Sequence, residues 1–184
     1  MSTASRPHRR HFLRHSVSLA AAALPALVTP ARASVPEARG LAMAHTHTRE
    51  HIDLVYAVRE RYVPESLGLL NRFLRDHYSG EVGVIDPALF DLLHRVRQVL
   101  GTAASFEVIS GYRDAATNSR LRATRGGGVA TKSLHMEGRA VDVRLPGVAL
   151  SDLRDAALSL RAGGVGYYPQ ERFVHIDTGR VRHW

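Results

Sequence analysis

The most informative segment of the chain places a histidine shortly before a predicted strand that carries an aspartate. It reads Ser133-Leu134-His135-Met136-Glu137-Gly138-Arg139-Ala140-Val141-Asp142. Residues 140–145 alternate between two faces, which predicts a strand with Asp142 on its polar face. Gly138 permits a bend between the two residues, because glycine adopts backbone angles that other residues avoid. We therefore expect His135 and Asp142 to meet at one point.

A second segment, Phe173-Val174-His175-Ile176-Asp177-Thr178, predicts another strand. Its alternation puts His175 and Asp177 on one face and aliphatic residues on the other. If the two strands are neighbours, His135, Asp142 and His175 can face one ion. Three such ligands with an open fourth position suit a catalytic zinc ion, which lowers the pKa of its bound water to about 7. Imidazole and carboxylate also suit other divalent metals, so Zn²⁺ is an inference at this point.

The elements that must position these residues suggest an α+β domain. Helical patterns occupy the earlier part of the chain and strands dominate after it, so we expect a small antiparallel sheet with flanking helices. The predicted helices cover residues 64–78, 86–100, 114–125 and 151–160, and the predicted strands cover residues 106–109, 140–145, 165–168 and 173–178. We expect an irregular lead-in over residues 34–63 and the folded domain over residues 64–184. His45, His47 and His51 fall in this lead-in, where solvated histidines are the expectation.

Residues 1–33 have the pattern of a cleaved export signal. A basic stretch precedes an apolar run at residues 17–28, and Ala31-Arg32-Ala33 has the form of a signal-peptidase site. The pair Arg9-Arg10 resembles a twin-arginine signal, although His8 stands where that pattern has Ser or Thr, so Sec export stays open. We expect a periplasmic or otherwise exported protein with no membrane span in the mature chain, because the apolar run is too short to cross a bilayer.

The net charge of +8 gives little support to nucleic-acid binding. Five arginines and no acidic residue lie within residues 1–33, which leaves a net charge of +3 on the rest. The chain has no cysteine, which excludes disulfides, thiolate nucleophiles and cysteine-ligated metals. Any metal must therefore be held by histidines and carboxylates.

The zinc-like segment and the downstream His175 resemble the M15-type metallopeptidases of the hedgehog/D-Ala-D-Ala peptidase fold. More narrowly, Ser110-Gly111-Tyr112-Arg113, Asn118 and the closing run from His175 to Trp184 resemble the murein endopeptidase branch called DUF882 or YcbK/MepK-like. Similarity covers most of residues 41–184. The resemblance implies a zinc-dependent endopeptidase that acts on the stem or cross-link peptides of peptidoglycan.

The same resemblance implies roles for single residues. His135, Asp142 and His175 match the zinc ligands of the family. Arg113 matches an arginine that stabilises charge on the attacked carbonyl oxygen, a role that its permanent positive charge suits. Ser133 and Tyr112 are expected at the substrate site.

The general base is less clearly marked, because Arg172 stands where many M15 enzymes have a glutamate, three residues before the last ligand. We expect Asp177 to be the base, since it shares a strand face with His175. It has an alternative role, which is to hold the tautomer of a ligand histidine. Glu171 is the reserve candidate for the base.

Two other functions remain open from the sequence alone. The displaced glutamate is compatible with a zinc-stabilised peptidoglycan-binding module that has lost catalysis. A D-alanyl-D-alanine carboxypeptidase would use the same metal chemistry but release a single D-Ala.

Overall fold

The computed structural model describes Met1 and residues 37–124 and 129–184, and these form an α+β fold, as the sequence predicts. The predicted export signal and the glycine run 126–128 lie outside the described residues. In the part that is described, no helix has the length and apolar character needed to span a membrane.

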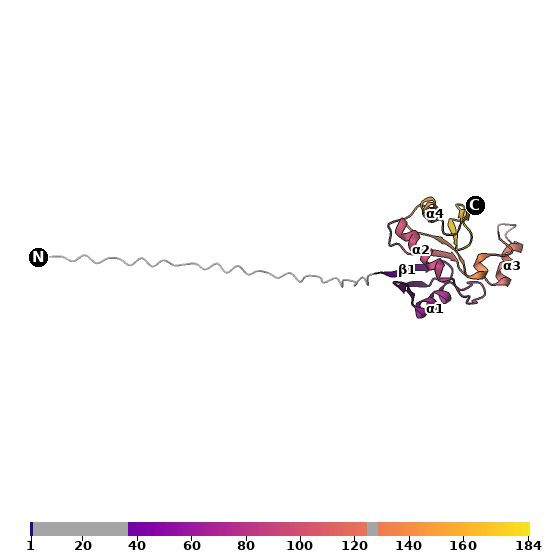
Figure 1. Ribbon diagram of the computed structural model, residues 1–184, viewed down its shortest axis with the longest axis horizontal. Coiled ribbons are helices and arrows are strands. Elements are labelled where there is room, and N and C mark those ends of the chain that lie inside the picture. Colours follow the sequence, from indigo (N-terminus) through magenta and orange to yellow (C-terminus); the bar gives the residue numbers. More distant parts are fainter. Residues whose placement is uncertain (2–36, 125–128) are drawn as a thin grey trace. The chain divides into compact units, whose positions relative to one another are not determined.

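Over residues 37–124 and 129–184, the structure has one mixed sheet and four α-helices (Figure 1). In chain order the elements are β1 (Ala38–His45), β2 (His51–Val58), β3 (Arg61–Tyr62), α1 (Pro64–Phe73), α2 (Pro87–Val99), β4 (Phe106–Ser110), α3 (Ala115–Thr124), a 3₁₀ helix η1 (Leu134–Glu137), β5 (Ala140–Arg144), α4 (Leu150–Ser159), β6 (Gly164–Tyr168), β7 (Phe173–Asp177) and β8 (Arg182–His183).

The sheet has eight strands in the order β3-β2-β1-β4-β5-β7-β6-β8. Most neighbours are antiparallel, but β1 pairs with β4 and β6 pairs with β8 in parallel. The expected small antiparallel sheet therefore corresponds to its central part, β4-β5-β7-β6.

The expectation of an irregular lead-in over residues 34–63 is wrong, because most of this segment forms β1, β2 and β3. The sequence of β1 does not show the alternation of apolar and polar residues that predicts a strand. Its inward residues Leu41, Met43 and His45 are separated by alanines instead of polar residues, and the third inward residue is itself polar. The domain thus begins with a strand hairpin that pairs with the central sheet through β4.

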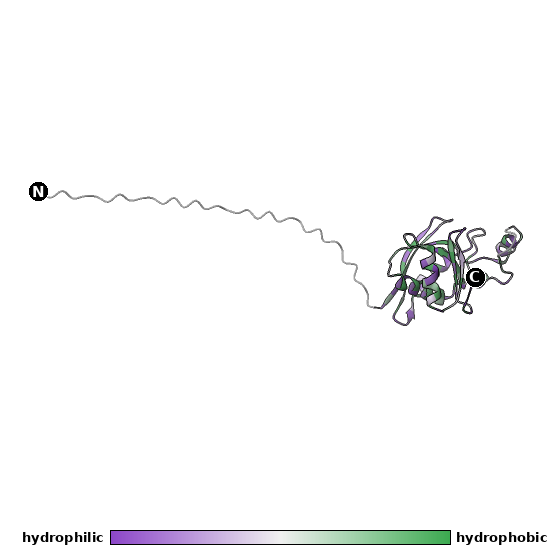
Figure 2. Ribbon diagram, turned by 90° about the horizontal axis from the view of Figure 1, so that it is seen from above, coloured by the Kyte–Doolittle hydropathy of each residue, from purple (hydrophilic) through white to green (hydrophobic). Residues whose placement is uncertain are grey.

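Aliphatic residues on one face of the central strands build the hydrophobic core. Val108, Val143 and Val174 have no exposed surface and lie across from one another in register. α2 contacts β1, and α4 contacts β6, β7 and α2, so these helices cover this face. Figure 2 shows apolar residues gathered along the strands and the helices against them. Burial of this apolar surface is the main source of stability.

The opposite face of the same strands carries the polar residues of interest. Asp142 in β5 lies directly across from His175 in β7 and from Ser110 in β4. The β4–β5 register shifts between Val108 and Ser110, as a β-bulge does, and bulges of this kind redirect side chains next to active sites.

α1 ends at Phe73, earlier than the predicted end at residue 78. The side chain of Asp76 explains the difference, because its Oδ1 accepts a hydrogen bond from the backbone N–H of Tyr78 at 2.9 Å. Its Oδ2 accepts another from the N–H of Asp114 at 3.0 Å. This buried carboxylate thus fixes a turn and ties it to the loop before α3.

Gly138 connects η1 to β5 and so sets the position of His135 relative to Asp142. Its φ is +66°, and a Cβ at this position would lie 1.9 Å from the carbonyl oxygen of Val84. Gly147 has a similar φ of +81°, but a Cβ there would meet nothing within 4 Å.

We predict that Gly138→Ala lowers the free energy of unfolding by about 3 kcal/mol, from left-handed strain plus steric overlap. The matched control Gly147→Ala has only the strain and should lose about 1 kcal/mol. Urea denaturation of both variants measures the difference. Equal losses would show that the close approach to Val84 does not constrain the fold.

Candidate metal centre and its pocket

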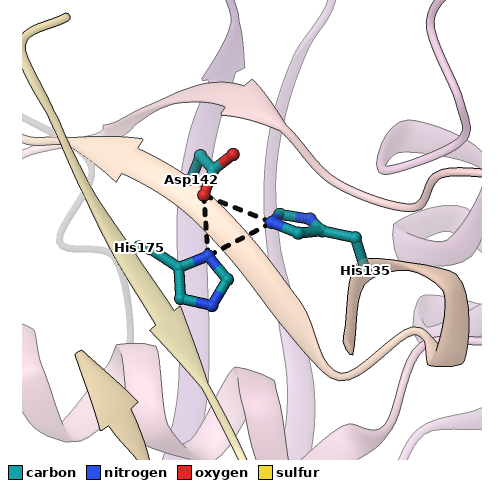
Figure 3. Close-up of side chains that lie close together, drawn as sticks. All are labelled: His135, Asp142 and His175. Carbon is teal, nitrogen blue, oxygen red and sulfur yellow. Dashed lines mark hydrogen bonds and ion pairs between the residues drawn. The ribbon is translucent and has the colours of Figure 1, made fainter. Parts of the chain in front are cut away.

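Three side chains from η1, β5 and β7 converge on one point (Figure 3). Oδ1 of Asp142 lies 3.2 Å from Nε2 of His135 and 2.9 Å from Nδ1 of His175. The two histidine nitrogens are 3.2 Å apart. Within the described residues, this is the one group of three or more His, Asp or Glu whose ligand atoms all lie within 4.8 Å of one another. The structure thus brings together the three ligands that the sequence predicts.

The ring of His135 is fixed from behind by the backbone. Its Nδ1 lies 2.7 Å from the carbonyl oxygen of Gly111, which can only accept a hydrogen bond, so Nδ1 carries the proton. The lone pair of Nε2 therefore accepts from Nη2 of Arg113 at 3.2 Å and faces the point where Asp142 and His175 meet. The side chain is 2% exposed, so this orientation is held inside the protein.

Asp177 fixes the ring of His175 in the same way. Its Oδ2 lies 3.1 Å from Nε2 of His175, which leaves Nδ1 to face the point of convergence. Arg182 donates to both carboxylate oxygens, at 3.1 and 2.7 Å, and the backbone N–H groups of Gly164 and Gly179 donate to Oδ1. A carboxylate behind a ligand histidine fixes its tautomer and raises its basicity.

The electrostatics of the cluster match this geometry. Burial alone would raise the pKa of Asp142, but His135 and His175 hold it well below its ordinary value. Burial lowers the pKa of His135, which favours the neutral imidazole. Burial would also lower the pKa of His175, but its hydrogen bonds to Asp142 and Asp177 raise it to about 9. Without a metal ion, a proton at His175 therefore offsets part of the charge of the two carboxylates, which Arg113 and Arg182 also contact.

The donor set fits a divalent metal ion. Two imidazole nitrogens and one carboxylate oxygen bind Zn²⁺ at about 2.0–2.2 Å, which in a tetrahedral site places ligand atoms about 3.3 Å apart. The observed separations of 2.9–3.2 Å are close to that spacing. Both imidazoles already present the nitrogen that is not bound from behind. His135, Asp142 and His175 are therefore the residues that would hold a metal.

Arg113 lies against the same cluster. Its Nη2 is 2.5 Å from Oδ2 of Asp142, and its Nε donates to Oγ of Ser110 at 2.9 Å. Its backbone N–H donates to the carbonyl oxygen of His135. Arg113 thus fixes the outer oxygen of the ligand carboxylate while its guanidinium also borders the adjoining pocket.

The three predicted ligands lie at the wall of a pocket of about 600 Å³. Of the other residues expected at the site, Arg113, Ser133 and Glu171 line this pocket. Ser133 is 8% exposed and precedes η1, as expected of a residue that orients the ligand segment.

Tyr112, which the sequence predicts at the substrate site, is not among the residues that line this pocket. Its ring contacts Gly83, where a Cβ would lie 2.3 Å from the ring, and it is partly buried against the core. Its backbone N–H donates to the carbonyl oxygen of Leu74. In this structure Tyr112 therefore anchors the Ser110–Arg113 segment.

The geometry of Asp177 does not fit the expected role of general base. The side chain has no exposed surface, does not line the pocket, and both oxygens already accept hydrogen bonds. Burial would raise the pKa of Asp177, but hydrogen bonds from His175 and Arg182 keep it below its ordinary value. This environment fits the alternative role, in which Asp177 holds the tautomer of His175.

The end of β1 and the β1–β2 turn carry two histidines, His45 and His47, for which the sequence predicts a solvated segment. His45 is 2% exposed, and its Nδ1 accepts a hydrogen bond from the backbone N–H of His47 at 3.2 Å. His47 lines the pocket, and its ring stacks on His77 with centroids 4.1 Å apart. Burial lowers the pKa of both His45 and His77 to about 4, so both are neutral at pH 7.

Aromatic residues line the pocket next to His175. The ring of Trp184 lies 5.3 Å from that of His175, and its Nε1 donates to the hydroxyl of Tyr168. Trp184 is 50% exposed, so its ring is not enclosed in the core. No sequence signal distinguishes an aromatic residue at a pocket wall from one that packs against a sheet.

An α+β fold with a His-Asp-His centre beside an open pocket is the arrangement expected of M15-type metallopeptidases. The model of the Peptidase_M15_2 family, described as peptidoglycan L,D-endopeptidase MepK, matches residues 33–184. The chain belongs to this family.

Curated relatives carry the same description. The chain is 50% identical over 170 residues to "Peptidoglycan L,D-endopeptidase MepK" of Escherichia coli (strain K12), which covers 91% of each chain. It is 39% identical over 155 residues to "Probable peptidoglycan L,D-endopeptidase MepK" of Haemophilus influenzae, which covers 84% of this chain and 83% of the relative.

We predict that Asp177→Asn weakens the affinity for a divalent metal about 10- to 100-fold, because an amide supports the basicity of His175 less well than a carboxylate. Competition with a chromophoric chelator measures the affinity. At saturating metal, most of the activity should return. Full metal binding with abolished turnover would instead restore Asp177 to the role of general base.

Proposed function

We propose that this protein is a zinc-dependent endopeptidase that hydrolyses peptide cross-links in peptidoglycan. The observation that carries the proposal is the convergence of His135, Asp142 and His175 beside an open pocket. The names of the curated relatives support the substrate class.

The relatives' names also favour one type of bond. An L,D-endopeptidase cleaves between the carbonyl of an L-centre and the nitrogen of a D-centre. A cross-link between two diaminopimelate residues contains such a bond, whereas a D-Ala–diaminopimelate cross-link joins two D-centres. We therefore place the diaminopimelate–diaminopimelate cross-link first among the substrates.

The residues of the site would have different roles in hydrolysis. A bound Zn²⁺ would supply Lewis acidity and a lowered pKa for water. Arg113 keeps Asp142 in place and presents a permanent positive charge to a carbonyl oxygen in the pocket. Asp177 and the Gly111 carbonyl keep the two imidazoles aimed at the same point.

Glu171 is the proposed proton acceptor, because it is the one pocket-lining carboxylate in the described part of the chain besides the ligand Asp142. It would take a proton from the attacking water and return it to the leaving amine. His47 is the alternative, since its imidazole lines the same pocket and its backbone is fixed by His45.

We further propose that the protein works outside the cytoplasm. Peptidoglycan lies there, and residues 1–33 have the pattern of an export signal. A site built from histidines and a carboxylate has no thiol to oxidise in such a compartment.

Purified protein should split cross-linked muropeptide dimers into monomers, as measured by liquid chromatography and mass spectrometry. Chelation and His135→Ala should each abolish the reaction, and Zn²⁺ should restore only the chelated wild type. Metal binding without hydrolysis of any muropeptide would instead indicate a binding module. Release of single D-Ala with dimers left intact would indicate a carboxypeptidase.

Glu171→Gln should lower kcat at least about 100-fold with unchanged metal content, which is the effect expected for loss of a general base. His47→Gln serves as the comparison, measured under the same conditions. Unchanged kcat in Glu171→Gln together with a large loss in His47→Gln would transfer the proton-accepting role to His47.

A further inference from the structure

The positively charged side chains of the pocket differ in whether they already pair with a carboxylate. Two of its arginines are committed to buried carboxylates: Arg113 to Asp142, and Arg182 to Asp177. Arg182 also donates to the carbonyl oxygen of Arg180 and lies over the ring of Trp184. These guanidinium groups hold the metal ligands and their supports in place, which limits their use for binding a second anion.

Lys132 is the remaining cation of the pocket wall. It is exposed and lines the pocket, and within the described residues it makes no hydrogen bond or ion pair. It is also the single lysine of the chain, whose other 24 basic residues are arginines. A lysine ammonium carries three donors on a flexible stem, so it can follow an anion that enters the pocket.

The backbone around Lys132 is anchored on both sides. On one side, Nδ2 of Asn118 donates to the carbonyl oxygen of Ala130 at 3.1 Å, and Asn118 is 2% exposed. On the other side, Ser133 is buried and its carbonyl oxygen accepts the N–H of Met136 in η1. The ammonium is therefore presented from a fixed position three residues before the ligand His135.

We propose that Lys132 binds a free carboxylate of diaminopimelate in the substrate and so selects diaminopimelate over lysine in the stem peptide. This inference rests on the proposed function. Diaminopimelate has a carboxylate at each end, and the one at its D-centre stays free when that centre is cross-linked. Lysine at the same position in a stem peptide lacks this group. A charge-assisted contact to an otherwise unpartnered ammonium distinguishes the two.

The kinetic test uses two cross-linked tripeptide dimers, one with free diaminopimelate carboxylates and one with these carboxylates amidated. Lys132→Gln should raise KM for the free-carboxylate dimer about tenfold and change kcat less than about twofold. Its effect on the amidated dimer should be small. Lys132→Arg keeps the charge and should recover most of the loss. Arg122→Gln, which removes an exposed charge in α3 outside the pocket, should leave both substrates unaffected.

A second measurement does not depend on turnover. Acetylation of the metal-free protein can modify only one lysine side chain, so mass spectrometry of the peptide that contains Lys132 reports its accessibility. The free-carboxylate dimer should slow this acetylation about tenfold at saturation, and the amidated dimer should not.

The outcomes separate the two proposals. If the wild type cleaves both dimers equally well and Lys132→Gln matches it, the role of Lys132 is refuted and the endopeptidase stands. If the wild type cleaves neither dimer, the proposed function fails, and acetylation still decides whether Lys132 meets the carboxylate. Equal protection by both dimers would also overturn the inference.

Discussion

The site depends on the hydrogen bonds that hold two imidazoles from behind. Gly111 accepts from His135, and Asp177 accepts from His175, so each ring presents one chosen nitrogen to Asp142. Three such atoms about 3 Å apart repel one another unless a positive charge lies among them. In the protein alone, a proton on His175 and the guanidinium of Arg113 provide that charge. A divalent cation would do so with more charge, which is why this arrangement favours metal binding.

The pairing of strands in the sheet brings the side chains of this site together. Because Asp142 and His175 are direct partners in the β5–β7 ladder, their side chains stand on the same face without any loop to position them. The other face of both strands is aliphatic and fully buried, so a slip of one residue would place charges in the core. His135 is less constrained by the sheet and depends on Gly138, whose close approach to Val84 fixes the end of η1.

The sequence predicted the parts of the site that follow from strand alternation. The period of two places Asp142 on the polar face of residues 140–145, and His175 and Asp177 on one face of residues 173–178. That these two faces are neighbours follows from the β5–β7 pairing in the structure. The alternation does not tell whether the carboxylate of Asp177 reaches the pocket or lies behind the ring of His175. That difference comes from Arg182 and two backbone N–H groups, which close around Asp177 only in the folded chain. Likewise, β1 was missed because alanines occupy the positions where a polar residue would reveal the alternation.

The most direct test of the account is X-ray absorption spectroscopy at the zinc edge on the protein loaded with one equivalent of Zn²⁺. We predict a four-coordinate site with two imidazole nitrogens, a carboxylate oxygen and one further light atom at about 2.0–2.2 Å. His135→Ala should remove one imidazole contribution from the spectrum. A six-coordinate ion without imidazole scattering, or a spectrum unchanged in His135→Ala, would contradict the assignment of the metal centre to His135, Asp142 and His175.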